Sequence, residues 1–446
     1  MKLLHTTQSV CPVCLSTIAA DLVEEPDGIY MQKRCPEHGS FHTLIWEGSS
    51  QSWLDWNRGN KTPDVIPDAA PPKEGCPRDC GLCSQHKRSG CCVLLELTKR
   101  CNLRCPVCFA SAGEADGADI SFADISAQMD WLMAHGGPFN LQLSGGEPTM
   151  RDDLPELIRL GLQKGFSFFQ LNTNGIRLAC ERDYARRLKD AGLNTVFLQF
   201  DGLKDSIYQK LRGRPLLREK LAAIRRCDEA GLGVVLVPTV APEINEADIG
   251  EILTFAEKHM PTVRGVHFQP ISYFGRCSLS PNGKRITIPA LLRELEQQTG
   301  GRIKAADFTG GGAENPYCSF HASYMKLPSG ALKPLKKRGN SCCCTTTSAQ
   351  SRVSVARQWS GAKLRVKSAD GSSSIPQGFD DFLAEAHNST LAVSGMLFQD
   401  AWNLDLERLQ HCYICEADAK YGMVPFCAYN LTDINGRSLY RGGNGT

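Results

Sequence analysis

Residues 92 to 275 follow one pattern, in which short apolar runs alternate with segments that have helical spacing. The apolar runs predict strands at 92–98, 140–144, 168–172, 196–200, 233–238 and 265–270. Strands that alternate with helices pair in parallel and are joined by right-handed crossovers. Because six such units fall short of the eight in a closed barrel, we expect an α/β fold built on a partial (β/α)6 TIM-like barrel. In such folds the chemistry gathers on the loops after the strands.

Cysteine is unusually abundant, with 21 among 446 residues. The N-terminus shows no secretory signal, and no run reaches the ~18 apolar residues of a membrane span. We therefore expect a cytoplasmic protein whose thiols stay reduced and bind metal. Lys plus Arg (50) nearly balances Asp plus Glu (48), which gives no indication of a nucleic-acid partner and allows at most transient contact with a membrane.

Three cysteines, Cys101, Cys105 and Cys108, directly follow the first predicted strand. Three thiolates on a short loop can hold three irons of a [4Fe–4S] cluster and leave the fourth iron open. A zinc site would instead use four protein ligands, usually from paired CxxC units. After the second predicted strand comes the stretch 144–148, Ser-Gly-Gly-Glu-Pro. Its glycines let the backbone approach a ligand, and Glu147 offers a negative charge for a substrate ammonium.

The segment Cys101-Asn-Leu-Arg-Cys105-Pro-Val-Cys108 resembles the CxxxCxxC signature of radical S-adenosylmethionine (SAM) enzymes. The resemblance implies that the open iron chelates the amino and carboxylate groups of SAM, and that reductive cleavage releases a 5′-deoxyadenosyl radical. Residues 145–147 match the family's GGE motif, which contacts the methionine amino group. At Val107 the family commonly has an aromatic residue near the adenine, and Phe109 is the candidate to replace it.

Polar side chains also end the later strands, where they could hydrogen-bond ribose and carboxylate groups of a cofactor. The alternative for Asn174 and Asp201 is turn formation, because each precedes a glycine. The predicted cofactor-binding residues are Gly145, Gly146, Glu147, Pro148, Asn172, Gln199 and Gln269.

A first auxiliary metal site is predicted near the N-terminus, within an expected small domain at 1–60. Cys11 and Cys14 form one knuckle, and Cys35 and His38 form a second about twenty residues later. This set fits one tetrahedral ion, either zinc or rubredoxin-like iron. The ion would supply much of the folding energy of so small a segment.

One or two auxiliary [4Fe–4S] clusters are predicted from the remaining cysteine groups. The first follows a proline-rich linker, within the segment 61–91, and comprises Cys76, Cys80 and Cys83, with Cys91 or Cys92 as the fourth ligand. The second lies at 412–427 in a C-terminal extension, 281–446, and comprises Cys412, Cys415 and Cys427, with Cys318 completing it. Residues 333–374, which contain the triplet Cys342–Cys344, are expected to be a flexible loop because they are rich in Lys, Ser, Thr and Gly.

Further motifs narrow the resemblance to a subgroup that contains tetraether lipid synthase and the dihydropterin-modifying radical methyltransferases. They are CPRDCGLC (76–83), LSGGEPT (143–149), LQFDG (198–202), LRG (211–213), LVPTV (236–240) and FQP (268–270). The resemblance covers about residues 8 to 280 and implies methylation, or carbon–carbon bond formation, at an unactivated carbon of a lipid or small molecule. It also implies an electron donor such as ferredoxin or flavodoxin. The alternatives are a maturase of a peptide or redox protein, and a non-catalytic iron–sulfur or zinc module.

Overall fold

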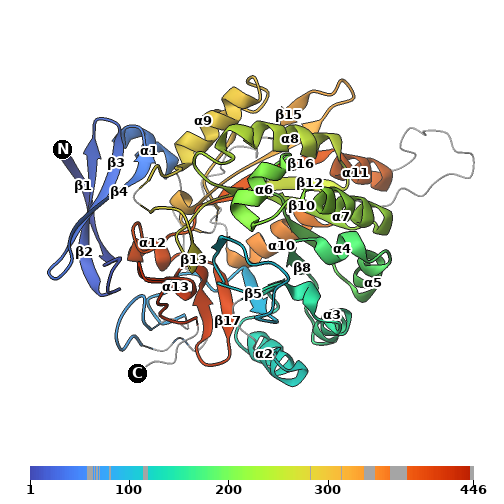
Figure 1. Ribbon diagram of the computed structural model, residues 1–446, viewed down its shortest axis with the longest axis horizontal. Helices are drawn as coiled ribbons and strands as arrows, with labels where there is room; N and C mark the ends of the chain where they lie inside the picture. Colours follow the sequence, from blue (N-terminus) through green and yellow to red (C-terminus); the bar gives the residue numbers. More distant parts are fainter. Residues whose placement is uncertain are drawn as a thin grey trace, which may run out of the picture.

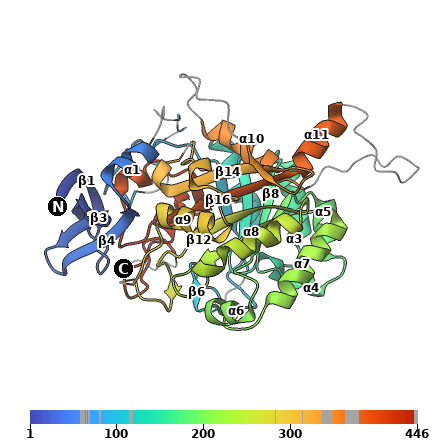
Figure 2. The same ribbon diagram turned by 90° about the horizontal axis from the view of Figure 1, so that it is seen from above.

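The computed structural model describes residues 1–57, 64, 66, 69, 71–79, 82–113, 119–281, 283–312, 314–335, 347–361 and 379–441. A small antiparallel sheet lies at one end of the molecule, beside a larger α/β body (Figures 1 and 2). None of the described helices combines the length and the apolar character that a bilayer crossing requires.

The N-terminal sheet has the order β1-β2-β3-β4, and helix α1 follows it. Its elements are β1 (Lys2–Val10), β2 (Thr17–Glu25), β3 (Gly28–Cys35), β4 (Gly39–Glu47) and α1 (Ser50–Trp56). Several contacts join it to the body, and they include the following two. The buried Lys33 ammonium donates to the carbonyl oxygen of Ala401 at 2.7 Å. The Trp53 ring stacks on Tyr317 with 4.8 Å between centroids.

The centre of the body is the predicted partial barrel, and the fold prediction is confirmed. Neighbouring strands pair in parallel in the order β5-β7-β8-β9-β10-β12. These strands are β5 (Cys92–Glu96), β7 (Asn140–Ser144), β8 (Phe169–Thr173), β9 (Thr195–Gln199), β10 (Gly233–Val237) and β12 (Val263–Pro270). The intervening helices are α2 (Phe122–Ala134), α3 (Leu154–Gln163), α4 (Ile176–Cys180), α5 (Tyr184–Ala191), α6 (Asp205–Arg212), α7 (Leu217–Ala230) and α8 (Ile249–Lys258).

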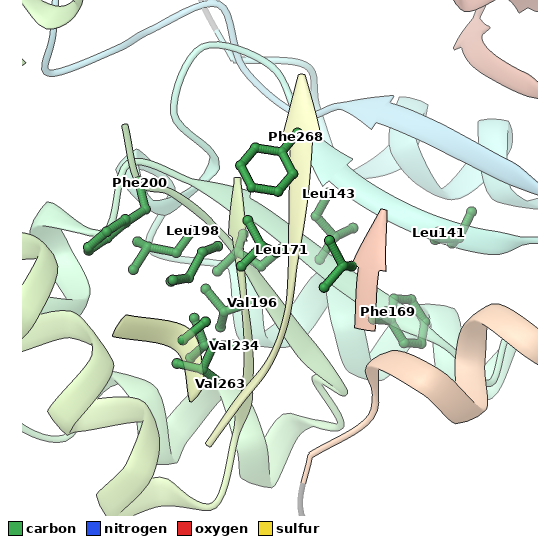
Figure 3. Packing of buried hydrophobic residues seen from close by; sticks show 14 of the residues in the cluster. Leu141, Leu143, Phe169, Leu171, Val196, Leu198, Phe200, Val234, Val263 and Phe268 are labelled. Carbon is green, nitrogen blue, oxygen red and sulfur yellow. The ribbon is translucent and has the colours of Figure 1, made fainter. Parts of the chain in front are cut away.

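Side chains alternate between the two faces of these strands, which separates the hydrophobic core from the barrel interior. Leu141, Leu143, Leu171 and Leu198 belong to one buried apolar cluster (Figure 3). Successive side chains of a strand point to opposite faces, so the residues between them face the barrel interior. Each large apolar side chain that is fully buried stabilises the fold by about 1.5–3 kcal/mol. The same pattern that builds the core therefore places polar side chains inside the barrel.

The C-terminal extension continues this sheet at both edges, which the sequence pattern did not predict. At one edge β16 (Thr390–Met396) pairs in parallel with β12, and β14 (Ser319–Lys326) and β15 (Leu332–Pro334) follow it. At the other edge β17 (Ile414–Asp418) pairs in parallel with β5, and β18 (Gly422–Pro425) pairs with β17. The barrel and the extension therefore share one sheet, to which 12 described strands belong.

The expectation of a flexible loop at 333–374 is wrong for part of that segment. Ser348–Trp359 form helix α10, whose first turn has a capping box between Thr347 and Gln350. The Trp359 ring packs against Phe197 of β9 with 4.8 Å between centroids, so α10 fills one end of the barrel. Cys342–Cys344 lie outside the described residues.

The other described elements are short or lie around the barrel mouth. They are β6 (Val107–Cys108), β11 (Thr239–Val240), β13 (Arg276–Cys277), α9 (Ile288–Gln298), α11 (Phe379–Asn388), α12 (Leu406–Leu409), α13 (Phe426–Tyr429), and the 3-10 turns η1 (Pro148–Met150), η2 (Glu246–Asp248), η3 (Ala305–Asp307) and η4 (Pro316–Cys318). β6 pairs antiparallel with β13, which fixes the end of the three-cysteine loop.

Candidate active site and metal centres

A cavity of about 250 Å³ opens among the loops that follow the barrel strands, and the predicted residues converge on it. Nine of the predicted residues line it: Cys101, Cys105, Cys108, Gly145, Gly146, Glu147, Asn172, Gln199 and Gln269. Pro148 is not among the lining residues, because it is buried as the first residue of η1. The structure therefore brings these nine predicted residues to one cavity.

The two glycines of the loop after β7 are required by a close approach to the three-cysteine loop. The Gly146 amide donates to the carbonyl oxygen of Thr98 at 2.8 Å, and the Glu147 amide donates to that of Arg100 at 2.9 Å. A Cβ atom on Gly145 or Gly146 would overlap these same carbonyl oxygens. The loop after β7 is therefore fastened to the segment that leads into Cys101.

The Glu147 carboxylate is 1% exposed and joins the ends of two strands. Its Oε1 atom accepts hydrogen bonds from the Thr149 and Thr173 hydroxyls, both at 2.7 Å. The same oxygen accepts from the Thr149 amide, and Oε2 accepts from the Asn174 amide at 2.7 Å. Three of these hydrogen bonds reach Oε1 and one reaches Oε2. The carboxylate, which also lines the cavity, thereby positions the loops after β7 and β8.

A buried ion pair beside the cysteines was not predicted. Nη2 of Arg212 lies 2.6 Å from Oδ1 of Asp201, and Arg212 also donates to the Thr239 hydroxyl at 2.8 Å. Burial raises the pKa of the Cys105 thiol, and the Arg212 guanidinium opposes that rise. The sequence signal was the Leu-Arg-Gly motif, which we had used only for the resemblance. Asp201 thus holds a cation at the cysteine loop and is not a simple turn residue.

Lys220 is a second cation that the sequence analysis missed. Its Nζ atom is fully buried and donates to the Asn174 carbonyl oxygen at 2.6 Å and to Oε1 of Gln199 at 3.3 Å. Burial lowers the pKa of Lys220 to about 8. Lys220 was not predicted as a site residue because it lies on the amphipathic helix α7, where lysines are usually exposed.

The cavity has an aromatic rim and a partly polar floor. Phe398 and Phe426 of the rim come from the C-terminal extension, and their ring centroids lie 4.3 Å apart. Phe109 also lines the cavity, 5.5 Å from Phe426. On the floor, Nδ1 of His267 lies 2.9 Å from the Ser394 hydroxyl, and burial lowers the pKa of His267 to about 4.

The N-terminal metal site is confirmed as a cluster of ligands. One ligand atom from each of Cys11, Cys14, Cys35 and His38 lies within 4.8 Å of the others. Burial tends to raise the pKa of Cys35, but hydrogen bonds, chiefly with His38 at 3.4 Å, lower it to about 7. A preformed set of one imidazole and three thiols, with one thiol poised to ionise, fits a single tetrahedral ion.

Two protein-family models match the chain: the radical SAM superfamily over residues 95–256 and the HMPTM N-terminal zinc ribbon domain over residues 3–47. The chain is also 33% identical to the 7,8-dihydro-6-hydroxymethylpterin dimethyltransferase of Methanocaldococcus jannaschii, with 95% of this chain and 93% of that protein aligned. The chain belongs to the radical SAM superfamily. The zinc ribbon match fits zinc as the ion of the N-terminal site.

Other similarities cover part of this radical SAM chain. The Fe-coproporphyrin III synthase of Methanosarcina barkeri is 34% identical over 43% of this chain, which spans 46% of that protein. The probable GTP 3′,8-cyclase of Sulfolobus acidocaldarius is 31% identical over 46% of this chain and 66% of its own length. Among solved structures, Streptococcus suis SuiB bound to S-adenosylmethionine aligns over 47% of each chain, with 17% identity and a TM-score of 0.41.

The three-cysteine loop fits the [4Fe–4S] cluster of a radical SAM enzyme. Burial, together with the negative charges of Glu147 and the other two cysteines, raises the pKa of Cys101 to about 12. Such thiols ionise only when a cationic group binds them, and iron supplies that charge.

The first auxiliary group is placed differently from the prediction. Cys76 and Cys83 line one small cavity, whereas Cys80 lies outside the described residues. The Cys92 thiol lies 3.8 Å from the Cys91 thiol. Hydrogen bonds with Cys91 and with Gln142, which lines the barrel cavity, lower the pKa of Cys92, although burial raises it. Because side chains alternate between the two faces of β5, Cys92 faces the barrel interior.

The cysteines of the second predicted auxiliary group interact with one another. The charges of Cys412 and Cys318 add to burial in raising the pKa of Cys427. Nη2 of Arg408 donates to the Cys318 sulfur at 3.3 Å, and the Gln399 amide donates to the Cys427 sulfur at 3.2 Å. Such donors are typical partners of cluster thiolates. Cys415 is buried in the main apolar core, and the charge of Cys412 adds to burial in raising its pKa.

Proposed function

We propose that this radical SAM enzyme methylates, or forms a carbon–carbon bond at, an unactivated carbon of a small molecule held in the cavity. A reduced pterin is the first substrate class to test. The observation that carries the proposal is the similarity to the dihydropterin dimethyltransferase along 95% of the chain, which includes regions outside the barrel. A likeness confined to the barrel would support SAM cleavage alone.

The cavity offers separate positions for cofactor and substrate. When bound, the cluster and SAM supply a 5′-deoxyadenosyl radical. Cys101, Cys105 and Cys108 hold the cluster, and residues 145–147 bring the backbone to it. Lys220 places a positive charge behind Gln199, where it would attract the SAM carboxylate.

The floor of the cavity suits a nitrogen heterocycle. Gln142 and Asn172 are joined by a hydrogen bond of 3.2 Å, and both line the cavity. His267 lies on the floor as well and is uncharged at neutral pH because its pKa is about 4. Amide and imidazole groups can donate to and accept from ring nitrogens and carbonyls, while Phe197 offers an aromatic face.

A lipid substrate is the second candidate, and the rim favours it. Phe274, Phe398 and Phe426 line the cavity beside Ile271 and Ile414. This apolar surface would accept a hydrocarbon chain and exclude water from a reactive carbon. The electron for SAM cleavage would come from a small redox protein such as ferredoxin or flavodoxin.

The test is an anaerobic assay of the full-length protein with reconstituted clusters, dithionite and SAM that carries a deuterated methyl group. We expect 5′-deoxyadenosine from the wild type and none from Cys105→Ala. With 7,8-dihydro-6-hydroxymethylpterin present, we expect a pterin that contains the deuterated methyl group. A coupled or methylated lipid from added lipid extract, with no pterin product, would overturn the pterin assignment in favour of the second candidate. If the wild type forms no 5′-deoxyadenosine, the chain is a non-catalytic module.

A further inference from the structure

We propose that His86 is a protein ligand of the auxiliary metal centre to which Cys76 and Cys83 belong. This centre lies outside the SAM cavity, and the proposal goes beyond the function proposed above. It replaces Cys91 or Cys92, which the sequence analysis expected as the remaining ligand.

The first observation is the placement of His86 with the two cysteines. All three line one small cavity between the segment 76–86 and residues 409–410. His86 follows Cys83 by three residues, which is the spacing that joins Cys35 to His38 in the zinc ribbon. The chain therefore already uses a Cys-x-x-His pair to bind a metal at its N-terminus.

The second observation is the hydrogen bond that His86 makes on its other side. Nε2 of His86 lies 2.7 Å from the carbonyl oxygen of Cys412. A carbonyl oxygen only accepts, so Nε2 carries the proton and donates it. In the neutral ring Nδ1 then bears a lone pair, and among the described residues no hydrogen bond involves it. A ring nitrogen that donates to a carbonyl while the other is free is the usual arrangement of a metal-binding histidine.

The competing ligands at this cavity are already engaged. Oδ2 of Asp79 accepts hydrogen bonds from the amides of Glu74 at 2.5 Å and Gly75 at 2.6 Å, so its carboxylate closes the preceding turn. Cys92 faces Cys91 and the barrel interior. Among the described residues that line the cavity, His86 remains as the nitrogen base.

The same hydrogen bond connects two cysteine groups. The carbonyl that His86 holds belongs to Cys412, whose thiol lies with those of Cys318 and Cys427. A metal-bound His86 would therefore link the two auxiliary centres through one hydrogen bond. A neutral imidazole in place of a thiolate also leaves the centre less negative and raises its reduction potential.

The experiment is pulsed electron paramagnetic resonance on the full-length, anaerobically reconstituted and reduced protein. The starting variant carries Cys101→Ala, Cys105→Ala and Cys108→Ala, which removes the SAM cluster and leaves the auxiliary centres. Histidine labelled with 15N identifies any nitrogen coupled to the cluster spin. Zinc at the N-terminal site would be diamagnetic and contribute no signal.

We expect a strong histidine nitrogen coupling that His86→Ala abolishes. His86→Cys, which keeps a ligand, should retain the iron content, lose the coupling and lower the reduction potential. The control His135→Ala, at the end of α2, should keep the coupling. Absence of the coupling in the starting variant, or its persistence in His86→Cys, would overturn the proposal. If His86→Ala does not fold, the coupling in the starting variant and its loss in His86→Cys still decide the proposal.

Discussion

Arg212 and Asp201 form a bidentate ion pair that is almost completely buried next to the three-cysteine loop. Nε of Arg212 lies 2.7 Å from Oδ2 of Asp201, and Nη2 lies 2.6 Å from Oδ1. Nη1 donates to the carbonyl oxygen of Val107, between the second and third cysteines, at 3.3 Å. This pair fixes both the shape of the cysteine loop and the positive charge beside it.

Breaking this pair should destabilise the fold and change the cluster. Arg212→Met leaves Asp201 buried and uncompensated, which costs about 3–5 kcal/mol in the free energy of unfolding. Loss of a positive charge should also lower the reduction potential of the SAM cluster, because the added electron is less well stabilised. Denaturation with urea and a redox titration measure the two effects. Arg159→Met removes an exposed ion pair with Glu156 and should cost at most about 1 kcal/mol, with no change in potential.

Gly146→Ala should prevent the cysteine loop from closing. The new Cβ would overlap the Arg100 carbonyl oxygen, which is backbone and cannot rotate away. We expect low iron content at the SAM cluster and at least a tenfold loss of 5′-deoxyadenosine formation. Gly283→Ala is the matched control, because its Cβ would lie 3.4 Å from the nearest heavy atom. Equal activity of the two variants would contradict the role given to Gly146.

SAM affinity should fall as the pH rises through about 8. Lys220 has a folded-state pKa of about 8, so its charge is present below that pH and lost above it. The charge that attracts the SAM carboxylate is lost in the same range. Equilibrium binding of SAM between pH 6.5 and 9.5 (on the order of one to two units either side of this pKa) measures the change. Lys220→Met should bind SAM weakly at every pH, and a wild-type affinity that does not change with pH would refute the role of Lys220.

The same group has the opposite effect on stability. The unfolded-state pKa of lysine is about 10.4, so the folded protein binds fewer protons than the unfolded chain between about pH 8 and 10. The contribution of Lys220 to the free energy of unfolding should therefore rise with pH over that window. Urea denaturation of the wild type and Lys220→Met at pH 8 and 10 isolates it, and identical pH dependences would contradict the burial of a charged Lys220.

Helix α10 should be part of the barrel and not an appendage. Trp359→Ala removes a side chain that is 6% exposed and packs on Phe197, and we expect a loss of about 3–5 kcal/mol in stability. Val353→Ala alters a residue on the same helix that is 54% exposed and should change stability by less than about 0.5 kcal/mol. Similar stabilities of the two variants would show that α10 does not pack there.

The sequence predicted those parts of the molecule that depend on local spacing. Strand–helix alternation located the six barrel strands, and the cysteine spacing located the cluster loop after the first of them. The N-terminal group of three cysteines and one histidine was found because both pairs have a two-residue gap. The surroundings of Cys92 and Cys415 were not predicted, because they depend on which face of a strand each residue occupies.

Long-range contacts account for what was missed. Phe398 and Phe426 reach the cavity only because β16 and β17 join opposite edges of the sheet, and no local pattern encodes that pairing. Lys220 and Arg212 lie on helices where charged residues are common. Their burial follows from strand ends that are distant in sequence. Helix α10 was not predicted because its segment is mostly polar and has a single buried tryptophan.

The most direct test of the account is electron–nuclear double resonance of the SAM cluster in the full-length, anaerobically reduced protein with SAM labelled at its methionine amino nitrogen. If one iron is left free by Cys101, Cys105 and Cys108, the labelled nitrogen should couple strongly to the cluster spin, and Cys105→Ala should abolish the signal. A cluster spectrum that does not change when SAM is added would contradict the account, because a side chain of the protein would then occupy the fourth iron.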